Sequence, residues 1–216
     1  MTVHAQLLVL AKQPLPGRVK TRLTPPLPPE QAAAVARAAL LDTLEAVAAV
    51  PVLRSTVVLD GSPDGWLPPG FAVLPQRSGD LRDRLAGAFA DAHRALPVPL
   101  LLVGMDTPQV TPRLLGDALA LLLQPGTPAV LGLADDGGWW ALGVHAPRAG
   151  LFDGVPMSTD RAGAVQRERL SSRGLDARML PVLRDLDHVE DVQVIAPQLP
   201  PRARLRALAT ELGLVG

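Results

Sequence analysis

A cluster of positive charge lies near the N-terminus, in the segment from Lys12 to Leu23. Its cationic side chains are Lys12, Arg18, Lys20 and Arg22, and no acidic residue precedes Glu30. The last three stand two residues apart, so an extended backbone would aim them to the same side. Ammonium groups bind phosphate as compact point charges, and guanidinium groups bind it as planar forks. The segment therefore predicts a site for a polyanion as large as a diphosphate.

This positive charge is a local excess. The 216-residue chain carries 21 basic and 21 acidic side chains, so its formal net charge is zero. No overall field therefore attracts it to nucleic acid or to an anionic membrane. Both lysines of the chain lie in this one segment, whereas the other 19 basic residues are arginines spread along the sequence. A solvated basic loop without a ligand is the alternative interpretation.

A carboxylate directly follows the most apolar stretch of the chain, Leu100 to Val103, in the sequence Gly104-Met105-Asp106-Thr107-Pro108. Mg²⁺ and Mn²⁺ favour oxygen ligands, and Mg²⁺ commonly takes one or two carboxylates together with substrate oxygens. Asp106 is therefore a candidate metal ligand. In the alternative interpretation its carboxylate only accepts backbone N–H groups in the turn before Thr111.

A second acidic segment reads Asp135-Asp136-Gly137-Gly138. Adjacent carboxylates disfavour each other's ionisation unless a cation or hydrogen-bond donors offset the repulsion. The two glycines let the backbone approach a ligand closely. An ordinary hairpin turn between two strands is the alternative interpretation. The next residues, Trp139 and Trp140, would point to opposite faces of a strand, so at most one of them flanks a site.

A third acidic segment runs from Asp185 to Asp191 and is a candidate source of a second metal ligand. Such runs are more often solvated helix starts. We therefore expect Asp187 to be a helix N-cap, with Glu190 completing a capping box.

Several kinds of chemistry are excluded by residues that the chain lacks. It has no Cys, which removes thiolate nucleophiles, iron–sulfur clusters and disulfides. Its four histidines show no paired spacing for zinc. No Gly-x-Ser-x-Gly, Gly-x-Gly-x-x-Gly or Gly-x-x-x-x-Gly-Lys motif is present, so serine hydrolases, dinucleotide-binding dehydrogenases and P-loop NTPases are not supported. Aromatic residues make up only 3% of the chain, which leaves few platforms for stacking on single-stranded bases.

Strand and helix patterns alternate along the chain. Apolar runs bounded by turn residues predict strands at 3–10, 53–59, 71–74, 100–103, 129–133, 139–144 and about 179–182. Helical spacing and capping residues predict helices at 31–50, 80–95, 113–123, 160–172 and about 201–212. This alternation predicts an α/β fold with a doubly wound, mainly parallel sheet. Ligands bind such sheets beyond the carboxyl ends of the strands, so the loops after Leu10, Leu59, Val103 and Leu133 should carry the function.

The length and the absence of linkers predict a single domain over residues 1–216. An apolar N-terminal run without a preceding basic region is unlike a secretory signal. The longest uncharged stretch, 118–134, is interrupted by Pro125 and Gly126, so no membrane-spanning helix is expected. We expect a cytoplasmic protein with neither nucleic acid nor membrane partners.

Four motifs occur in order: Lys12 to Leu23, Gly79-Asp80-Leu81-Arg82-Asp83-Arg84, Gly104 to Pro108, and Leu131 to Gly143. Together they resemble the DUF2064 family, which consists of predicted GT-A-type glycosyltransferases in the nucleotide-diphospho-sugar transferase superfamily. The resemblance spans nearly the whole chain. More distantly, the chain is similar to molybdenum-cofactor guanylyltransferase and phospholactate guanylyltransferase.

The resemblance implies a role for each motif. Lys12, Arg18, Lys20 and Arg22 would line the loop that holds the nucleotide phosphates, and Gly17 and Asp80 within the same motifs complete the predicted nucleotide-binding residues. Asp106 would be the metal-binding aspartate. Asp136, Gly137 and Gly138 would face the sugar or the acceptor. The chain departs from the family where Met105 and Thr107 replace Ser, Trp139 replaces Tyr, and Met157 replaces Trp.

The function expected from these residues is metal-dependent glycosyl transfer from a nucleoside-diphosphate sugar to a small acceptor. Mg²⁺ or Mn²⁺ on Asp106 and the basic loop would stabilise the leaving diphosphate, and Asp136 would orient or deprotonate the acceptor. A nucleotidyltransferase that attacks a nucleoside triphosphate and releases pyrophosphate is the first alternative. A nucleotide-binding module without turnover is the second.

Overall fold

A seven-stranded sheet forms the centre of the protein in a computed structural model, which describes residues 2–216. Its strand order is β3-β2-β1-β4-β6-β5-β7. The strands are β1 (Val3–Lys12), β2 (Val52–Asp60), β3 (Ala72–Pro75), β4 (Leu100–Gly104), β5 (Ala129–Leu133), β6 (Trp139–Val144) and β7 (Ala177–Met179). The helices are α1 (Pro29–Ala48), α2 (Leu81–Ala95), α3 (Pro112–Leu122), α4 (Ala162–Ser172), α5 (Val189–Ile195) and α6 (Arg204–Glu211), with 3-10 turns η1 (Thr21–Leu23) and η2 (Ala196–Gln198).

The sheet is mainly parallel, as the sequence predicts. Neighbouring strands from β3 to β4 run parallel, and so do β5 and β7, whereas β6 is antiparallel to both β4 and β5. The centre of β1 and nearly all of β4 are buried because they lie between helices on both faces. Strand order changes direction at β1, which has β2 on one side and β4 on the other. In α/β sheets, a ligand crevice forms beside such a switch point.

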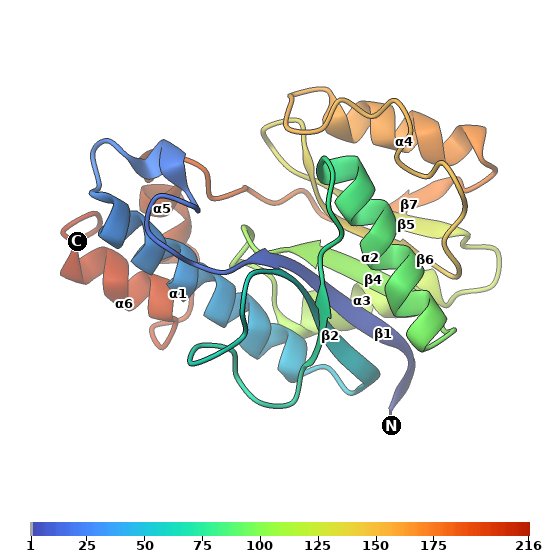
Figure 1. The fold of residues 1–216 in the computed structure, drawn as a ribbon, viewed down its shortest axis with the longest axis horizontal. Helices are drawn as coiled ribbons and strands as arrows, with labels where there is room; N and C mark the ends of the chain where they lie inside the picture. Colours follow the sequence, from blue (N-terminus) through green and yellow to red (C-terminus); the bar gives the residue numbers. More distant parts are fainter. Residues whose placement is uncertain (1) are drawn as a thin grey trace.

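Helices cover both faces of the sheet (Figure 1). One apolar cluster joins α1 and α3 to the face that carries Val9 and Trp140. The other joins α2 and α4 to the face that carries Leu8 and Leu142. A third cluster, separate from the sheet, packs α5 and α6 against the first half of α1 and includes Leu23 of η1. This last cluster fixes the end of the basic segment.

Two predicted elements differ from the structure. The last strand is Ala177–Met179, earlier than expected. Beyond it, the N–H groups of Leu180 and Leu183 donate to the carbonyls of Leu131 and Leu133, a shift of register that ends the regular ladder beside β5. The acidic segment after it contains a helix, α5, which agrees with the expected helix start there but has no counterpart among the predicted helix ranges. No helix within residues 2–216 is long and apolar enough to cross a membrane.

Helix α3 begins one residue before the predicted range, with Pro112 in its first turn and the hydroxyl of Thr111 accepting the backbone N–H of Leu114 at 3.1 Å. Thr111→Ala removes this N-cap and is expected to lower the free energy of unfolding by about 1 kcal/mol. Urea unfolding measures the change. Thr111→Ser keeps a hydroxyl and should retain most of the stability, so an equal loss in both variants would contradict a capping role.

Candidate active site

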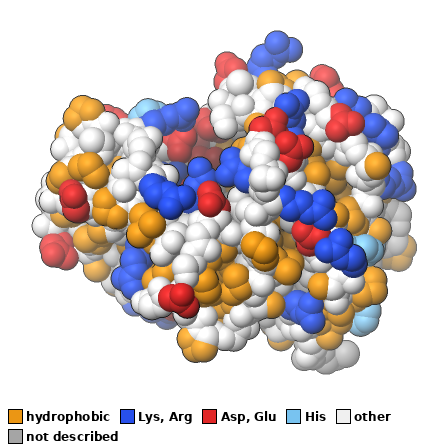
Figure 2. Space-filling view, in the orientation of Figure 1, with side chains coloured by type: hydrophobic (Ala, Val, Ile, Leu, Met, Phe, Trp, Pro, Cys, Tyr) orange, Lys and Arg blue, Asp and Glu red, His pale blue; other side chains and the backbone are white. Residues whose placement is uncertain are grey.

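A cleft of about 830 Å³ opens at the carboxyl edge of β1 and β4. Its walls come from the basic segment after β1, the first turns of α2, the turn after β4, the turn between β5 and β6, and the segment that leads to α5. Acidic and basic side chains lie next to one another around a hollow on this face (Figure 2). The cleft therefore occupies the switch point where the fold predicts a ligand.

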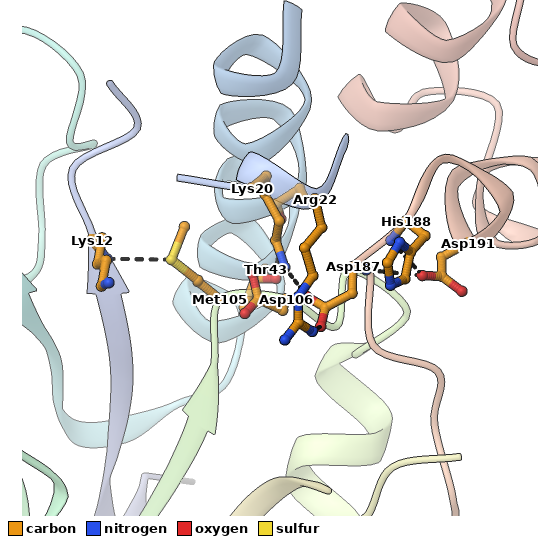
Figure 3. Close-up of polar contacts among 10 residues, drawn as sticks. Lys12, Lys20, Arg22, Thr43, Met105, Asp106, Asp187, His188 and Asp191 are labelled. Carbon is orange, nitrogen blue, oxygen red and sulfur yellow. Dashed lines mark hydrogen bonds and ion pairs between the residues drawn. The ribbon is translucent and has the colours of Figure 1, made fainter. Parts of the chain in front are cut away.

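The basic segment and Asp106 meet at this edge (Figure 3). The Nζ atom of Lys20 lies 2.7 Å from Oδ1 of Asp106 and 2.9 Å from Oδ1 of Asp187, and only 7% of the Lys20 side chain is exposed. Arg22 donates to the other oxygen of Asp187 at 2.8 Å. Opposite charges from three distant parts of the sequence thus converge in one cluster.

Lys20 reaches the cluster through an unusual backbone conformation. Its φ of 48° lies in the left-handed region and starts η1, where buried Leu23 anchors the segment. A left-handed conformation costs a non-glycine residue roughly 1–2 kcal/mol. Burial alone would lower the pKa of Lys20, but the carboxylates of Asp106 and Asp187 outweigh it and raise that pKa above its usual value. The ammonium is therefore charged at neutral pH and offsets the backbone strain by pairing.

Asp187 corrects a prediction from the sequence. The N-cap of α5 is His188, and the carboxylate that caps this helix start belongs to Asp191, which accepts the backbone N–H groups of Asp187 at 3.0 Å and His188 at 2.7 Å. The prediction of Asp187 as N-cap with Glu190 as its partner is wrong by one residue, because His188 is the N-cap and Asp191 is its capping-box partner. Burial opposes ionisation of Asp187, yet Lys20 and Arg22 lower its pKa.

Asp185 lies beside the same cluster and lines the cleft. Burial raises the pKa of Asp185 to about 8, helped by the nearby carboxylates of Asp106 and Asp136. The backbone N–H of Leu186 donates to the carbonyl of Asp106 at 2.9 Å, which holds the two segments together. The acidic segment from Asp185 to Asp191 was the sequence signal that could point to Asp185 as a site residue. Its position beside Asp106 depends on this long-range hydrogen bond.

The turn after β5 confirms the hairpin interpretation of its sequence and also borders the cleft. It is a hairpin turn, because the N–H of Ala134 donates to the carbonyl of Gly138 at 3.0 Å and joins antiparallel β5 and β6. It also lines the cleft through Asp136 and Gly138. Oδ1 of Asp136 accepts the backbone N–H of Gly138 at 2.8 Å, and Asp135 pairs with Arg184 at 2.7 Å.

The two tryptophans after this turn separate as predicted. Trp140 is 1% exposed, and its indole N–H donates to the carbonyl of Pro181 at 3.0 Å. Trp139 packs on the opposite face of the sheet, stacked on Phe152 with a centroid distance of 6.2 Å. Trp139 is the half-buried member of the pair, but both tryptophans line the cleft, so the prediction that at most one of them flanks the site is wrong.

Three predicted site residues, Gly17, Asp80 and Gly137, are not among the residues that line this cleft. Gly17 forms a turn with a φ of 72°. The carboxylate of Asp80 caps α2 by accepting the N–H groups of Arg82 at 2.8 Å and Asp83 at 3.1 Å. Gly137, with a φ of 88°, lies against the carbonyl of Asp160. Each of these residues has a local structural role, and the binding role expected from the resemblance stays a prediction.

The roles of Asp80 can be separated by experiment. Asn caps helices about as well as Asp, so Asp80→Asn should leave thermal stability almost unchanged. If capping is its whole role, the affinity for inorganic pyrophosphate, measured by calorimetry, should change by less than about twofold, well below the effect of losing a charged hydrogen bond. A tenfold loss of affinity at unchanged stability would instead support direct binding.

Among the described residues, three cationic side chains line the cleft without a close carboxylate partner: Lys12 and Arg18 of the basic segment, and Arg84 from α2. Arg84, in the first turn of α2, is 22% exposed, and the nearest carboxylate oxygen in its ion pair, on Asp60, is 3.9 Å away. Within residues 2–216, Lys12 and Arg18 form no ion pair with a carboxylate. These three side chains are therefore available to an anion, whereas Lys20 and Arg22 already hold carboxylates.

The carboxylates fit a divalent metal in part. They offer hard oxygen donors, and Oδ1 of Asp106 is buried with no hydrogen bond apart from its ion pair with Lys20. Within the described residues, however, no three acidic or histidine side chains are grouped closely enough to hold a metal ion. This donor set matches Mg²⁺, which usually binds through one or two carboxylates and completes its shell with water and substrate oxygens.

The fold is that of the nucleotide-diphospho-sugar transferases, and the cleft lies at the switch point of its sheet. More narrowly, the chain belongs to the family described as "Uncharacterized protein conserved in bacteria (DUF2064)", whose model matches residues 36–159. That range includes the segments around Asp80, Asp106 and Asp136. The basic segment lies before it. No curated protein matches the chain.

Solved structures resemble nearly the whole chain. A protein of Desulfovibrio desulfuricans G20, provisionally assigned as a nucleotide-diphospho-sugar transferase, is 26% identical with a TM-score of 0.88, over 99% of this chain and 97% of that one. A Mycobacterium sp. strain JC1 homologue of Mycobacterium tuberculosis rv0371c is 18% identical with a TM-score of 0.57, over 99% and 100%. CMP:2-keto-3-deoxy-manno-octonic acid synthetase complexed with CTP is 14% identical with a TM-score of 0.53, over 90% and 99%. The last two establish the fold alone.

Proposed function

We propose that this protein, as one domain over residues 1–216, is a metal-dependent glycosyltransferase that uses a nucleoside-diphosphate sugar and a small-molecule acceptor. The observation that carries the proposal is the meeting of the basic segment with Asp106 in one cleft, where Lys20 lies 2.7 Å from the carboxylate. The likeness to the Desulfovibrio protein, at 26% identity over nearly the full length, supports a nucleotide-sugar substrate.

The cations of the cleft would bind the leaving diphosphate. Lys12, Arg18 and Arg84 line one part of the cleft without a close carboxylate partner. Negative charge grows on the diphosphate as the bond to the sugar breaks, and fixed positive groups stabilise that charge without reorganising. Mg²⁺ or Mn²⁺, held by Asp106 with Asp185 as the adjacent ligand, would add a further positive charge at the phosphate oxygens.

The acceptor would approach from the side of the turn that holds Asp136. The hydroxyl oxygen of the acceptor attacks the anomeric carbon, the bond from that carbon to the diphosphate breaks, and the electron pair leaves with the diphosphate. Asp136 would orient the hydroxyl and accept its proton, because its Oδ1 is fixed by Gly138 and the side chain is exposed to the cleft. Trp139, in the same wall, offers an apolar surface for the sugar ring.

The released product tests this proposal. The protein is incubated with Mn²⁺ and a panel of nucleoside-diphosphate sugars and nucleoside triphosphates, chosen by the thermal shift that each ligand produces. Release of nucleoside diphosphate supports glycosyl transfer. The same cations and carboxylate would also suit nucleotidyl transfer, in which pyrophosphate is released. Binding without either product would support the nucleotide-binding module and contradict both transferases.

A further inference from the structure

The cation that holds Asp106 in this structure is a side chain of the protein itself. The Lys20 ammonium lies between Asp106 and Asp187, 2.7 Å and 2.9 Å from their nearest oxygens (Figure 3). With 7% of the side chain exposed, water solvates it very little. A buried ammonium without a partner is strongly unfavourable, so Lys20 needs at least one anion in its vicinity.

A metal ion and this ammonium would share the carboxylate of Asp106. Oδ1 is buried against Lys20, while the side chain as a whole is 37% exposed, so the other oxygen faces the cleft. A divalent ion on that oxygen would experience repulsion from the ammonium across the same carboxylate. This repulsion is strong where water is scarce, since the effective dielectric constant is low there.

The neighbouring charges do not require Lys20 to stay in place. Oδ2 of Asp187 accepts a hydrogen bond from Arg22 at 2.8 Å, so Asp187 keeps a cationic partner when the ammonium leaves. Asp106 would receive the metal ion in exchange. The only group that loses its partners is the ammonium, and an oxygen of a bound diphosphate in the same cleft would replace them.

We infer that Lys20 is a built-in counter-cation that keeps the metal affinity of the free protein low and yields Asp106 to the metal only when a diphosphate accepts the ammonium. Metal and diphosphate then bind with positive coupling, and each raises the affinity of the other by the same factor. This inference rests on the proposed function. It makes Lys20 a positioning residue that decides when the metal site forms.

Mn²⁺ binding to the free protein tests the inference. Lys20→Met keeps the length of the side chain and removes its charge. It should raise the affinity for Mn²⁺ alone by about tenfold or more, within the usual range of coupling between two sites, and it should reduce the gain in Mn²⁺ affinity that inorganic pyrophosphate produces. Electron paramagnetic resonance measures the loss of free Mn²⁺ beyond that in a protein-free sample with the same pyrophosphate concentration, because pyrophosphate alone also binds Mn²⁺. An unchanged or lower affinity for Mn²⁺ alone would overturn the inference.

Arg22→Met is the matched control. It removes the same formal charge from the same cluster, but Arg22 pairs with Asp187 and forms no ion pair with Asp106. Its Mn²⁺ affinity should rise much less than that of Lys20→Met. An equal rise in both variants would show a general effect of net charge and would also overturn the inference.

A second measurement uses the wild-type chain and does not depend on the folding of a variant. The chain contains only two lysines, Lys12 and Lys20, so labelling with ¹⁵N-lysine gives two side-chain ammonium signals. The Lys20 signal should keep its position with Mg²⁺ alone and shift when Mg²⁺ and inorganic pyrophosphate are added together. A Lys20 signal that stays in place under both conditions would show that the ammonium never leaves the carboxylates and would refute the exchange.

Failure of the proposed function gives a different result. Asp106→Asn should abolish Mn²⁺ binding in the presence of pyrophosphate. If that variant still binds Mn²⁺ as the wild type does, the metal role of Asp106 is wrong, whatever Lys20→Met shows. If Asp106→Asn loses Mn²⁺ but Lys20→Met gains no affinity, only the inference about Lys20 fails.

Discussion

Asp106→Asn is expected to lower the rate of the proposed transfer reaction by about a thousandfold. A metal ion contributes several kcal/mol of charge stabilisation in the transition state, and about 4 kcal/mol corresponds to a factor of roughly a thousand in rate. The substitution keeps the shape of the side chain and removes its charge. Steady-state release of the product nucleotide with Mn²⁺ measures the loss.

Asp117→Asn provides the matched control for this prediction. Asp117 lies on α3, and its side chain is 72% exposed with a long 3.7 Å contact to Arg113. It is absent from the lining of the cleft, so its rate should equal that of the wild type. Both variants should also unfold near the wild-type temperature. A folded Asp106→Asn protein with at least a tenth of the wild-type rate would exclude Asp106 from the catalytic machinery.

The proximity of the basic segment to Asp106 was predictable because both follow parallel strands of the same sheet. Lys20 comes shortly after β1, and Asp106 comes two residues after β4, and these strands are parallel neighbours. Carboxyl ends of adjacent parallel strands share one edge of the sheet, so any pair of loops that follow them must be close. Hydrophobic patterning located both strands, and this placement needs no knowledge of the side chains.

The surroundings of Asp106 could not be predicted in the same way. Asp187 follows Lys20 by 167 residues, and its local sequence favours a helix cap just as strongly as an ion pair. The choice depends on Asp191, whose carboxylate accepts the N–H of the N-cap residue His188, and on the hydrogen bond from Leu186 to the carbonyl of Asp106. Local propensity ranks such alternatives, but long-range contacts decide between them.

The same limit applies to Asp80. The resemblance implies nucleotide binding, and the helical pattern places Asp80 inside the predicted helix 80–95, so neither identifies it as an N-cap. The structure contains the cap, with reciprocal hydrogen bonds between Asp80 and Asp83. The carbonyl of Asp80 also accepts a hydrogen bond from Nε of Arg84 at 3.4 Å, so the cap helps to orient a cation of the cleft, and direct ligand binding by Asp80 stays a prediction.

Gly137→Ala is expected to lower the free energy of unfolding by about 3 kcal/mol, the sum of a left-handed backbone cost of roughly 1 kcal/mol and an overpacking cost of about 2 kcal/mol. Gly137 has a φ of 88°, and a Cβ there would overlap the carbonyl oxygen of Asp160. The N–H of Gly163 donates to the carbonyl of Gly137 at 2.8 Å and ties α4 to this turn. The carbonyl of Asp160, just before α4, therefore cannot move away freely from an added Cβ.

Gly126→Ala separates the two costs. Gly126 has a φ of 79°, similar to that of Gly137, but an added Cβ there would meet nothing within 4 Å. It should lose only the backbone contribution of about 1 kcal/mol. For a chain of this length, the predicted difference of about 2 kcal/mol corresponds to roughly 4–8 °C in melting temperature, which differential scanning calorimetry resolves.

Equal losses in the two variants would mean that the close approach to Asp160 contributes nothing. A larger loss at Gly137 would show that this turn and the segment 157–163 behave as one packed unit. Asp136 and Ser158 line the cleft from these two pieces, and Ser158 itself has a φ of 62°. Strain of this kind persists only where the surrounding structure fixes it. The packing of Gly137 would then be what keeps Asp136 in position for the acceptor.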